Sequence, residues 1–387
     1  MTSPVDTSVK WMRNTMPGAP VLTRAAGSLI GLLDAFLVNG WGQQTASSMV
    51  VLDGIATANF PTDHAAARHA VVLVDGVTGA MAALNGEQKV TSVEPNKIKW
   101  ATALPNGTAT GTITVKMAPA GWGKPFSGAN LAVYKSLAPE AHGQFLRVND
   151  AGAQTARVVG YETMTGISTG TGLFPSAAQV SGGYYWGKNN AASGTTPIDY
   201  LLASDGRFLY FLPRNAAEMY GSSSCAVYWF GDMVPLSPGG DPFATVLAGA
   251  PDPGFEGYGG TYFIDYGATD GPQAAPRPVS GVGTSSRGAT TAESRQVSFS
   301  STEILSTVTG QVSLSRVVYR DRTDAWPRAL LPGLWVANGR YAERAFQNYG
   351  VIDTVDGSSL VGFHYGDQVY ANAGTLLGAI DVKGPWR

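Results

Sequence analysis

The chain has 387 residues, a formal net charge of −2, and only 14% Asp, Glu, Lys and Arg. This charged fraction is far below the value of about 25% that is typical of globular proteins. Because no excess of basic residues is present to attract a phosphate backbone, the composition argues against nucleic-acid binding as the main activity. A chain of this length has room for about two or three domains.

The single cysteine, Cys225, rules out an intramolecular disulfide and a cysteine-based zinc site, and its apolar neighbours predict a buried side chain. The opening residues MTSPVD lack the basic start and apolar stretch of a signal peptide, so folding in the cytoplasm is expected. The strongest apolar run, residues 29–38, is shorter than the roughly 20 residues that cross a bilayer. Because Asp34 also interrupts this run, no membrane span is predicted.

A short helix is predicted at residues 28–38. Apolar side chains recur there at the spacing of one helical face, at Leu29, Leu32, Leu33 and Phe36. Ser28 is the expected N-cap residue, and Asn39-Gly40 supplies a left-handed stop. The segment 1–48 is therefore predicted to pack this helix on a larger domain.

Beyond the helix the pattern is that of a mainly β protein, with 49 Gly and 23 Pro to form turns. Strands are predicted at 55–60, 70–75, 88–93, 97–101 and 111–117, with apolar and polar residues alternating clearly at 97–100 and 112–117. Turn-forming pairs separate them: Asp75-Gly76, Asn85-Gly86, Pro95-Asn96 and Asn106-Gly107. Residues 49–118 are therefore predicted to form an inserted small β-barrel or sandwich module that projects from the body, and 119–121 its exit linker.

The remaining residues, 119–387, predict a large β-sandwich-like domain. Its strands are expected at 145–148, 157–161, 198–203, 207–212, 226–230, 297–299 and 316–319. Asp205-Gly206 is a strong hairpin signal between two of them. Residues 251–291 are rich in Gly, Pro and Ser, which predicts a long excursion from the domain.

Candidates for chemistry are few. Acids in aromatic surroundings could serve paired-carboxylate hydrolysis: Asp232, Asp241, Asp252, Glu256 and Asp265. Their Gly and Pro neighbours favour a role in turns. The four histidines lack metal-ligand spacing and are predicted to be structural or exposed: His64, His69, His142 and His364.

Two further patterns are weaker still. There is no Gly-x-Ser-x-Gly elbow, and the glycine-rich stretch 281–288 lacks the Gly-Lys-Ser/Thr ending of a nucleotide loop. The aromatic clusters 184–186, 228–230 and 258–266 could stack on sugars or anchor a protein interface, although core packing is the more frequent role. No catalytic, cofactor-binding or metal-ligating residue is assigned.

Residues 55–93 resemble a small β-module that recurs in bacteriophage virion proteins. The matching segments are IATANF at 55–60, His64, VVLVDG at 71–76 and ALNGEQKVTSV at 83–93. Ala65 follows His64 where that module usually has Gly.

The flanking segments are similar to uncharacterised structural proteins encoded among phage morphogenesis genes. These segments are KW at 10–11, MPGAP at 16–20, GSLI at 27–30, LD at 33–34, GWGKPFSG at 121–128, LPGLW at 331–335 and GPWR at 384–387. The resemblance implies a virion component without enzymatic activity, and it assigns no site residues.

The sequence therefore predicts a non-enzymatic structural protein of a bacteriophage virion, at the tail or baseplate, that assembles with copies of itself and with other virion proteins. A capsid decoration or head-associated protein is the alternative within the same class. The alternative from another class is a tail spike component that binds host-surface glycan or degrades polysaccharide. A low-charge surface suits large permanent interfaces, whose cores carry few charged residues.

Overall fold

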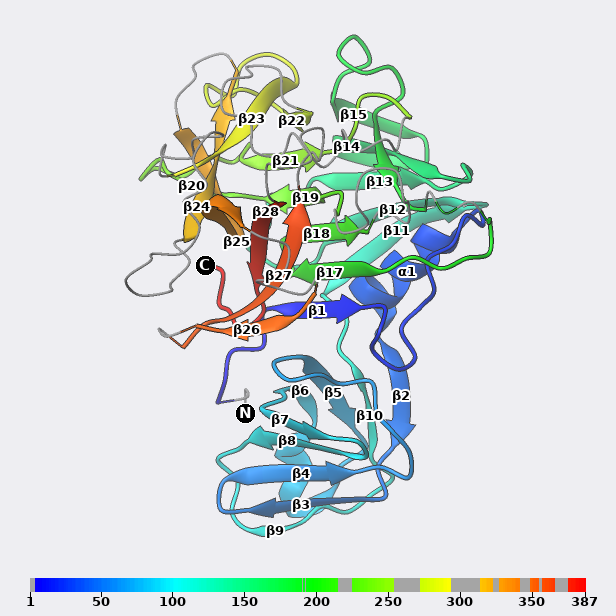
Figure 1. The fold of residues 1–387 in the computed structure, drawn as a ribbon, viewed down its shortest axis with the longest axis vertical. Coiled ribbons are helices and arrows are strands. Elements are labelled where there is room, and N and C mark those ends of the chain that lie inside the picture. Colours follow the sequence, from blue (N-terminus) through cyan, green and yellow to red (C-terminus); the bar gives the residue numbers. More distant parts are fainter. Residues whose placement is uncertain are drawn as a thin grey trace.

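The computed structural model describes residues 4–189, 191, 193–214, 225–253, 272–293, 314–322, 327–341, 349–354, 357–365 and 375–387. The fold is mainly β, with 50% strand and 6% helix. The strands of the described residues form four antiparallel sheets, arranged as a large sandwich-like body and a smaller lobe beneath it in Figure 1. The predicted fold class is confirmed.

The largest sheet has 13 strands and curls into a half-barrel. Its order is β1 (Lys10–Arg13), β17 (Tyr200–Ser204), β18 (Phe208–Pro213), β19 (Tyr228–Asp232), β21 (Thr245–Ala248), β22 (Gln273–Ala275), β23 (Ser286–Ala292), β24 (Leu314–Asp321), β25 (Pro327–Tyr341), β28 (Thr375–Asp381), β27 (Ser359–Tyr365) and β26 (Val351–Asp353), with β20 (Val234–Pro235) paired to β25. The predicted hairpin at Asp205-Gly206 joins β17 to β18.

A second sheet covers one face of this half-barrel. It contains β11 (Trp122–Gly128), β12 (Leu131–Ser136), β13 (Phe145–Asn149), β14 (Thr155–Gly166), β15 (Thr169–Phe174) and β16 (Tyr184–Gly187). Trp122 lies 5.9 Å from Phe230, and Trp186 lies 5.9 Å from Tyr228, between ring centroids. The neighbouring Trp229 points to the opposite face, as expected for the two-residue period of a strand. Trp122, Trp186, Tyr228 and Phe230 therefore fill the core between the two sheets, and Trp229 packs on the other face.

The predicted helix is present as α1 (Ser28–Leu33), followed by a π-helix, η1 (Asp34–Asn39). The predicted capping role of Ser28 is wrong: the cap position is Gly27, and the Ser28 hydroxyl donates to the Thr23 carbonyl at 2.7 Å. A carboxylate oxygen of Asp150 instead accepts from the backbone N–H of Leu29, at 2.7 Å, and of Ile30. The helix start is thus capped by a residue from the body, which local sequence patterns do not reveal.

The smaller lobe consists of two sheets packed face to face (Figure 1). One contains β2 (Trp41–Thr45), β10 (Thr114–Met117), β5 (Val71–Asp75) and β6 (Gly86–Lys89). The other contains β7 (Ser92–Glu94), β8 (Lys97–Ala101), β4 (Ile55–Asn59), β3 (Ser48–Leu52) and β9 (Gly107–Thr108). A 3-10 helix, η2 (Gly79–Leu84), precedes β6. We call residues 41–117 the module and the rest of the described chain the body.

The strand predicted at 88–93 is in fact two strands, β6 and β7, in different sheets. The Val90 N–H donates to the Ala70 carbonyl and the Thr91 N–H to the Lys99 carbonyl, so the chain crosses from one sheet to the other at this point. Continuous alternation of residue types cannot reveal such a corner, because both strands keep the same period.

Within the range of the predicted excursion, residues 273–275 and 286–291 form β22 and most of β23 in the large sheet, and residues 276–285 form the loop between these strands. The strands were missed because they are made of small and polar residues. A Cβ atom at Gly288 would lie 2.4 Å from the Tyr319 side chain. Only glycine therefore fits at the point where β23 passes that ring. The predicted strand at 297–299 and the whole aromatic cluster 258–266 lie outside the described residues, as do the other residues of 254–271.

Candidate functional site

The acids proposed for hydrolysis are separated into different structural networks. Asp241 accepts from Arg328 at 2.7 Å, and the same guanidinium lies 3.0 Å from Asp321. All three side chains are buried. Their arrangement is that of a neutralising ion-pair network inside the body, between β25 and β24. Asp252 is exposed, and Glu256 and Asp265 lie outside the described residues.

Asp232 belongs to a second network, with His142 and Thr245. The Thr245 hydroxyl donates to one carboxylate oxygen of Asp232 at 2.7 Å, and the His142 backbone N–H donates to the other at 2.8 Å. Burial lowers the pKa of the His142 ring, although the Asp232 charge opposes this. Because Thr245 is buried and its proton points to the carboxylate, the trio orders the loop before β13 and offers no accessible nucleophile.

The aromatic clusters are also used internally. Tyr184, Trp186 and the cluster 228–230 are buried, so their ring faces are closed to a sugar. Tyr185 is partly exposed, and the Arg157 guanidinium covers its ring at 3.8 Å. Cys225 is buried, as predicted, and burial raises the pKa of its thiol to about 12, so the reactive thiolate is not formed at neutral pH.

His64 is held entirely within the module. Its Nε2 lies 2.7 Å from the Glu94 carbonyl, and its Nδ1 accepts from the Ala66 N–H at 3.2 Å. This assigns the proton to Nε2. The backbone of Ala65 does not have a positive φ angle. The turn after His64 therefore does not need the Gly that the similar module of virion proteins usually has at this position. No group of three or more metal-ligating side chains occurs in the described ranges.

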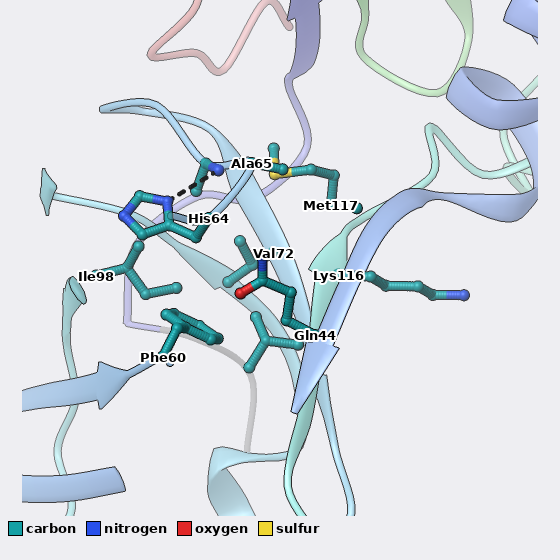
Figure 2. A pocket seen from close by; sticks show the side chains of 11 residues that line it. Gln44, Phe60, His64, Ala65, Val72, Ile98, Lys116 and Met117 are labelled. Atoms are coloured by element: carbon teal, nitrogen blue, oxygen red, sulfur yellow. Dashed lines mark hydrogen bonds between the residues drawn. The ribbon is translucent and has the colours of Figure 1, made fainter. Parts of the chain in front are cut away.

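A small hollow lies between the two module sheets (Figure 2). It is lined by apolar side chains together with Gln44, His64 and Lys116, and its cavity volume is only about 10 Å³. Gln44 Nε2 donates to the Asp63 carbonyl at 2.6 Å, while its Oε1 has no protein partner within the described part of the chain. A water molecule needs roughly 10–15 Å³ on the same measure, so the hollow has room for about one water and none for a substrate.

The densest set of long-range polar contacts lies where the module meets the body. Lys89 is buried there and donates to the carbonyls of Val9, at 3.2 Å, and Val382, at 3.0 Å. Burial lowers its pKa to about 8. Lys10 and Glu87 add an ion pair of 2.9 Å across the same junction.

A second group of contacts completes this junction. His69 Nε2 lies 2.9 Å from the Ser359 hydroxyl, which donates to Asp353 at 2.7 Å, and Arg68 pairs with Asp353. The sequence predicted a structural or exposed role for His69 in its loop, whereas its partner Ser359 is 290 positions away in the chain. No local signal could have joined them.

Three apolar side chains are exposed next to one another at the β3–β4 hairpin of the module. Leu52 is 61% exposed and faces Ile55, which is 39% exposed, across the β3–β4 hairpin. Val50 lies on the same face of β3. Asp53 and Gly54, with φ angles of 49° and 77°, form the tight turn that holds Leu52 against Ile55. This set of Val50, Leu52 and Ile55 is named the tip patch.

Fold and site together define a mainly β protein with a sandwich-like body, a docked β-module and an apolar tip patch on that module. None of the helices in the described ranges combines the length and apolarity needed to cross a membrane. No protein-family model matches the chain, and no curated protein matches it.

Proposed function

We propose that the chain is a non-enzymatic structural component of a bacteriophage virion, placed at the tail or baseplate. The single observation that carries this proposal is the tip patch, displayed on a compact module at one end of the molecule. Exposed apolar side chains that adjoin one another mark interaction sites more often than scattered ones do, and a patch on a projecting module is well placed to be covered by a neighbouring subunit.

The buried polar residues support the same proposal, because their side chains are used for internal contacts. Asp241, Asp232 and His142 are engaged in internal networks, and the low charge of the chain suits permanent packing within a particle. The resemblance of residues 55–93 to a module of virion proteins supplies the phage assignment.

Mass spectrometry of purified particles, separated into heads and tails, tests the location. We expect the chain in the tail fraction at a constant ratio to other tail proteins. Recovery from head fractions alone would replace the tail assignment by capsid decoration, and absence from both would refute the proposal.

The tip patch provides a sharper test. Leu52→Glu combined with Ile55→Glu places two carboxylates in the proposed contact, where unpaired charges cost several kcal/mol. We expect the purified variant to keep the melting temperature of the wild type, because both positions are exposed, while its incorporation into particles falls by more than about tenfold.

The matched control is Val282→Glu, which alters a body residue that is 77% exposed. It is expected to incorporate at the wild-type level. Equal incorporation of the tip-patch variant and the wild type would show that the patch contacts no other virion protein.

A further inference from the structure

The contact between His69 and Ser359 joins the module to the body through two buried side chains. His69 lies in the module loop before β5, and Ser359 begins β27 of the large sheet. The His69 backbone has a φ of 64°, an unusual conformation for a residue other than glycine, and its N–H donates to the Val90 carbonyl at 2.8 Å. Such backbone strain persists only where surrounding contacts impose it.

The direction of the hydrogen bonds defines the protonation state of this contact. The Ser359 hydroxyl donates to Asp353 at 2.7 Å, so towards His69 its oxygen accepts from the imidazole Nε2–H at 2.9 Å. A neutral imidazole with its proton on Nε2 satisfies this chain. A second proton would place a full positive charge on a ring that is closed off from water.

The surrounding charges oppose that second proton. Arg68 and Lys89 face His69 from the module and Lys383 faces it from the body, whereas Asp353 is the only anion that acts on it among the described residues. Asp353 is itself shared with Arg68 and Ser359. Burial is the largest cause, followed by Arg68 and Lys89, and together they lower the pKa of His69 to about 4.

Apart from these side-chain contacts, the module is joined to the body only by the chain itself, at its two ends. The chain enters it beside Gly40 and leaves it beside Gly121, which have φ angles of 74° and 83°. Figure 1 shows both connections on one side of the lobe, next to β2 and β10. A rotation at these two points would move the module off the body without breaking either of its sheets, as hinges at small residues do.

We propose that His69, Ser359 and Asp353 form an acid-operated latch: the neutral imidazole holds the module on the body, and protonation of His69 releases the module to move on its two connections. This inference concerns the conformation of the chain itself and does not depend on the proposed virion role.

The sign of the pH dependence follows from the two states. The exposed ring of a released module has the ordinary pKa of about 6.5, whereas the docked ring titrates near pH 4. The docked form therefore binds fewer protons between these values. Docking is strongest above pH 6.5 and weakens as the pH falls towards 4, by about two orders of magnitude in the docking equilibrium at pH 4.5.

Small-angle X-ray scattering of the full chain tests the latch. The maximum dimension is expected to increase reversibly between pH 7.5 and pH 4, with unchanged far-ultraviolet circular dichroism. His69→Gln keeps a donor towards Ser359 but has no titrating group, so this variant is expected to stay docked at pH 4. His64→Gln, which changes a histidine bonded only within the module, is expected to open as the wild type does.

Two outcomes would overturn the latch. One is a folded wild type with the same dimensions at pH 4 and pH 7.5. The other is opening of His69→Gln at the same pH as the wild type, which would assign the transition to carboxylates. Should His69→Gln fail to fold, His69→Asn, which tolerates the left-handed backbone better, takes its place. The latch also requires that the pKa of the His69 ring, followed by NMR in the wild type, is displaced from 6.5 towards 4.

Discussion

Replacing Asp150 by Ala is expected to lower the free energy of unfolding by about 3–5 kcal/mol, the cost of breaking a buried ion pair. Asp150 lies 2.5 Å from Lys188, and both side chains are fully buried. The same carboxylate accepts the backbone N–H groups of Leu29 and Ile30 at the start of α1. The substitution therefore leaves a buried ammonium without its counter-charge and two helix donors without an acceptor.

Urea denaturation followed by tryptophan fluorescence measures this loss. Asp150→Asn keeps an acceptor for the helix but removes the charge, so an intermediate loss is expected. Asp63→Ala changes an exposed aspartate and should stay within about 0.5 kcal/mol of the wild type. A loss below about 1 kcal/mol for Asp150→Ala would mean that the helix does not depend on the body in this way.

Arg328→Met is expected to lower the free energy of unfolding by a similar amount, about 3–5 kcal/mol. Arg328 neutralises Asp241 and Asp321 and also donates to the carbonyls of Arg277, at 2.7 Å, and Phe243, at 2.9 Å. Methionine fills much of the same volume but leaves two buried carboxylates facing each other. These carboxylates would have to take up protons or admit water.

Arg316→Met is the matched control, because Arg316 pairs with Glu293 at the surface, where both side chains are about half exposed. Surface ion pairs contribute at most about 1 kcal/mol, so the two arginine variants should differ clearly in the same denaturation experiment. Equal losses would contradict the description of Arg328 as the centre of a buried network.

The spacing of apolar residues along the sequence was sufficient to predict many of the strands. The predicted strand 97–101 coincides with β8, and the strands at 55–60 and 70–75 differ from β4 and β5 by one residue. Alternation carries this information in β4 and β8, because every second side chain of these strands is buried and the others are at least partly exposed. In β18 and β19 every residue is buried, and long apolar runs marked these strands instead.

What the sequence could not show are contacts between distant residues. Asp150 caps α1 across more than a hundred positions, and His69 reaches Ser359 across 290. β22 contains only Gln and Ala, so no pattern of large apolar residues marked it as part of a sheet. The junction of module and body could not be predicted from the sequence either. None of its residues belongs to a recognisable motif, and their contacts form only when distant segments of the chain are buried together.

The central claim is that this chain is a building block of a phage particle. A cryo-EM map of intact particles that contain the chain tests this most directly. We predict that the body and module fit together into repeated density at the tail or baseplate, with Val50, Leu52 and Ile55 covered by a neighbouring subunit. A map in which every density of this size is accounted for by other chains would contradict the account.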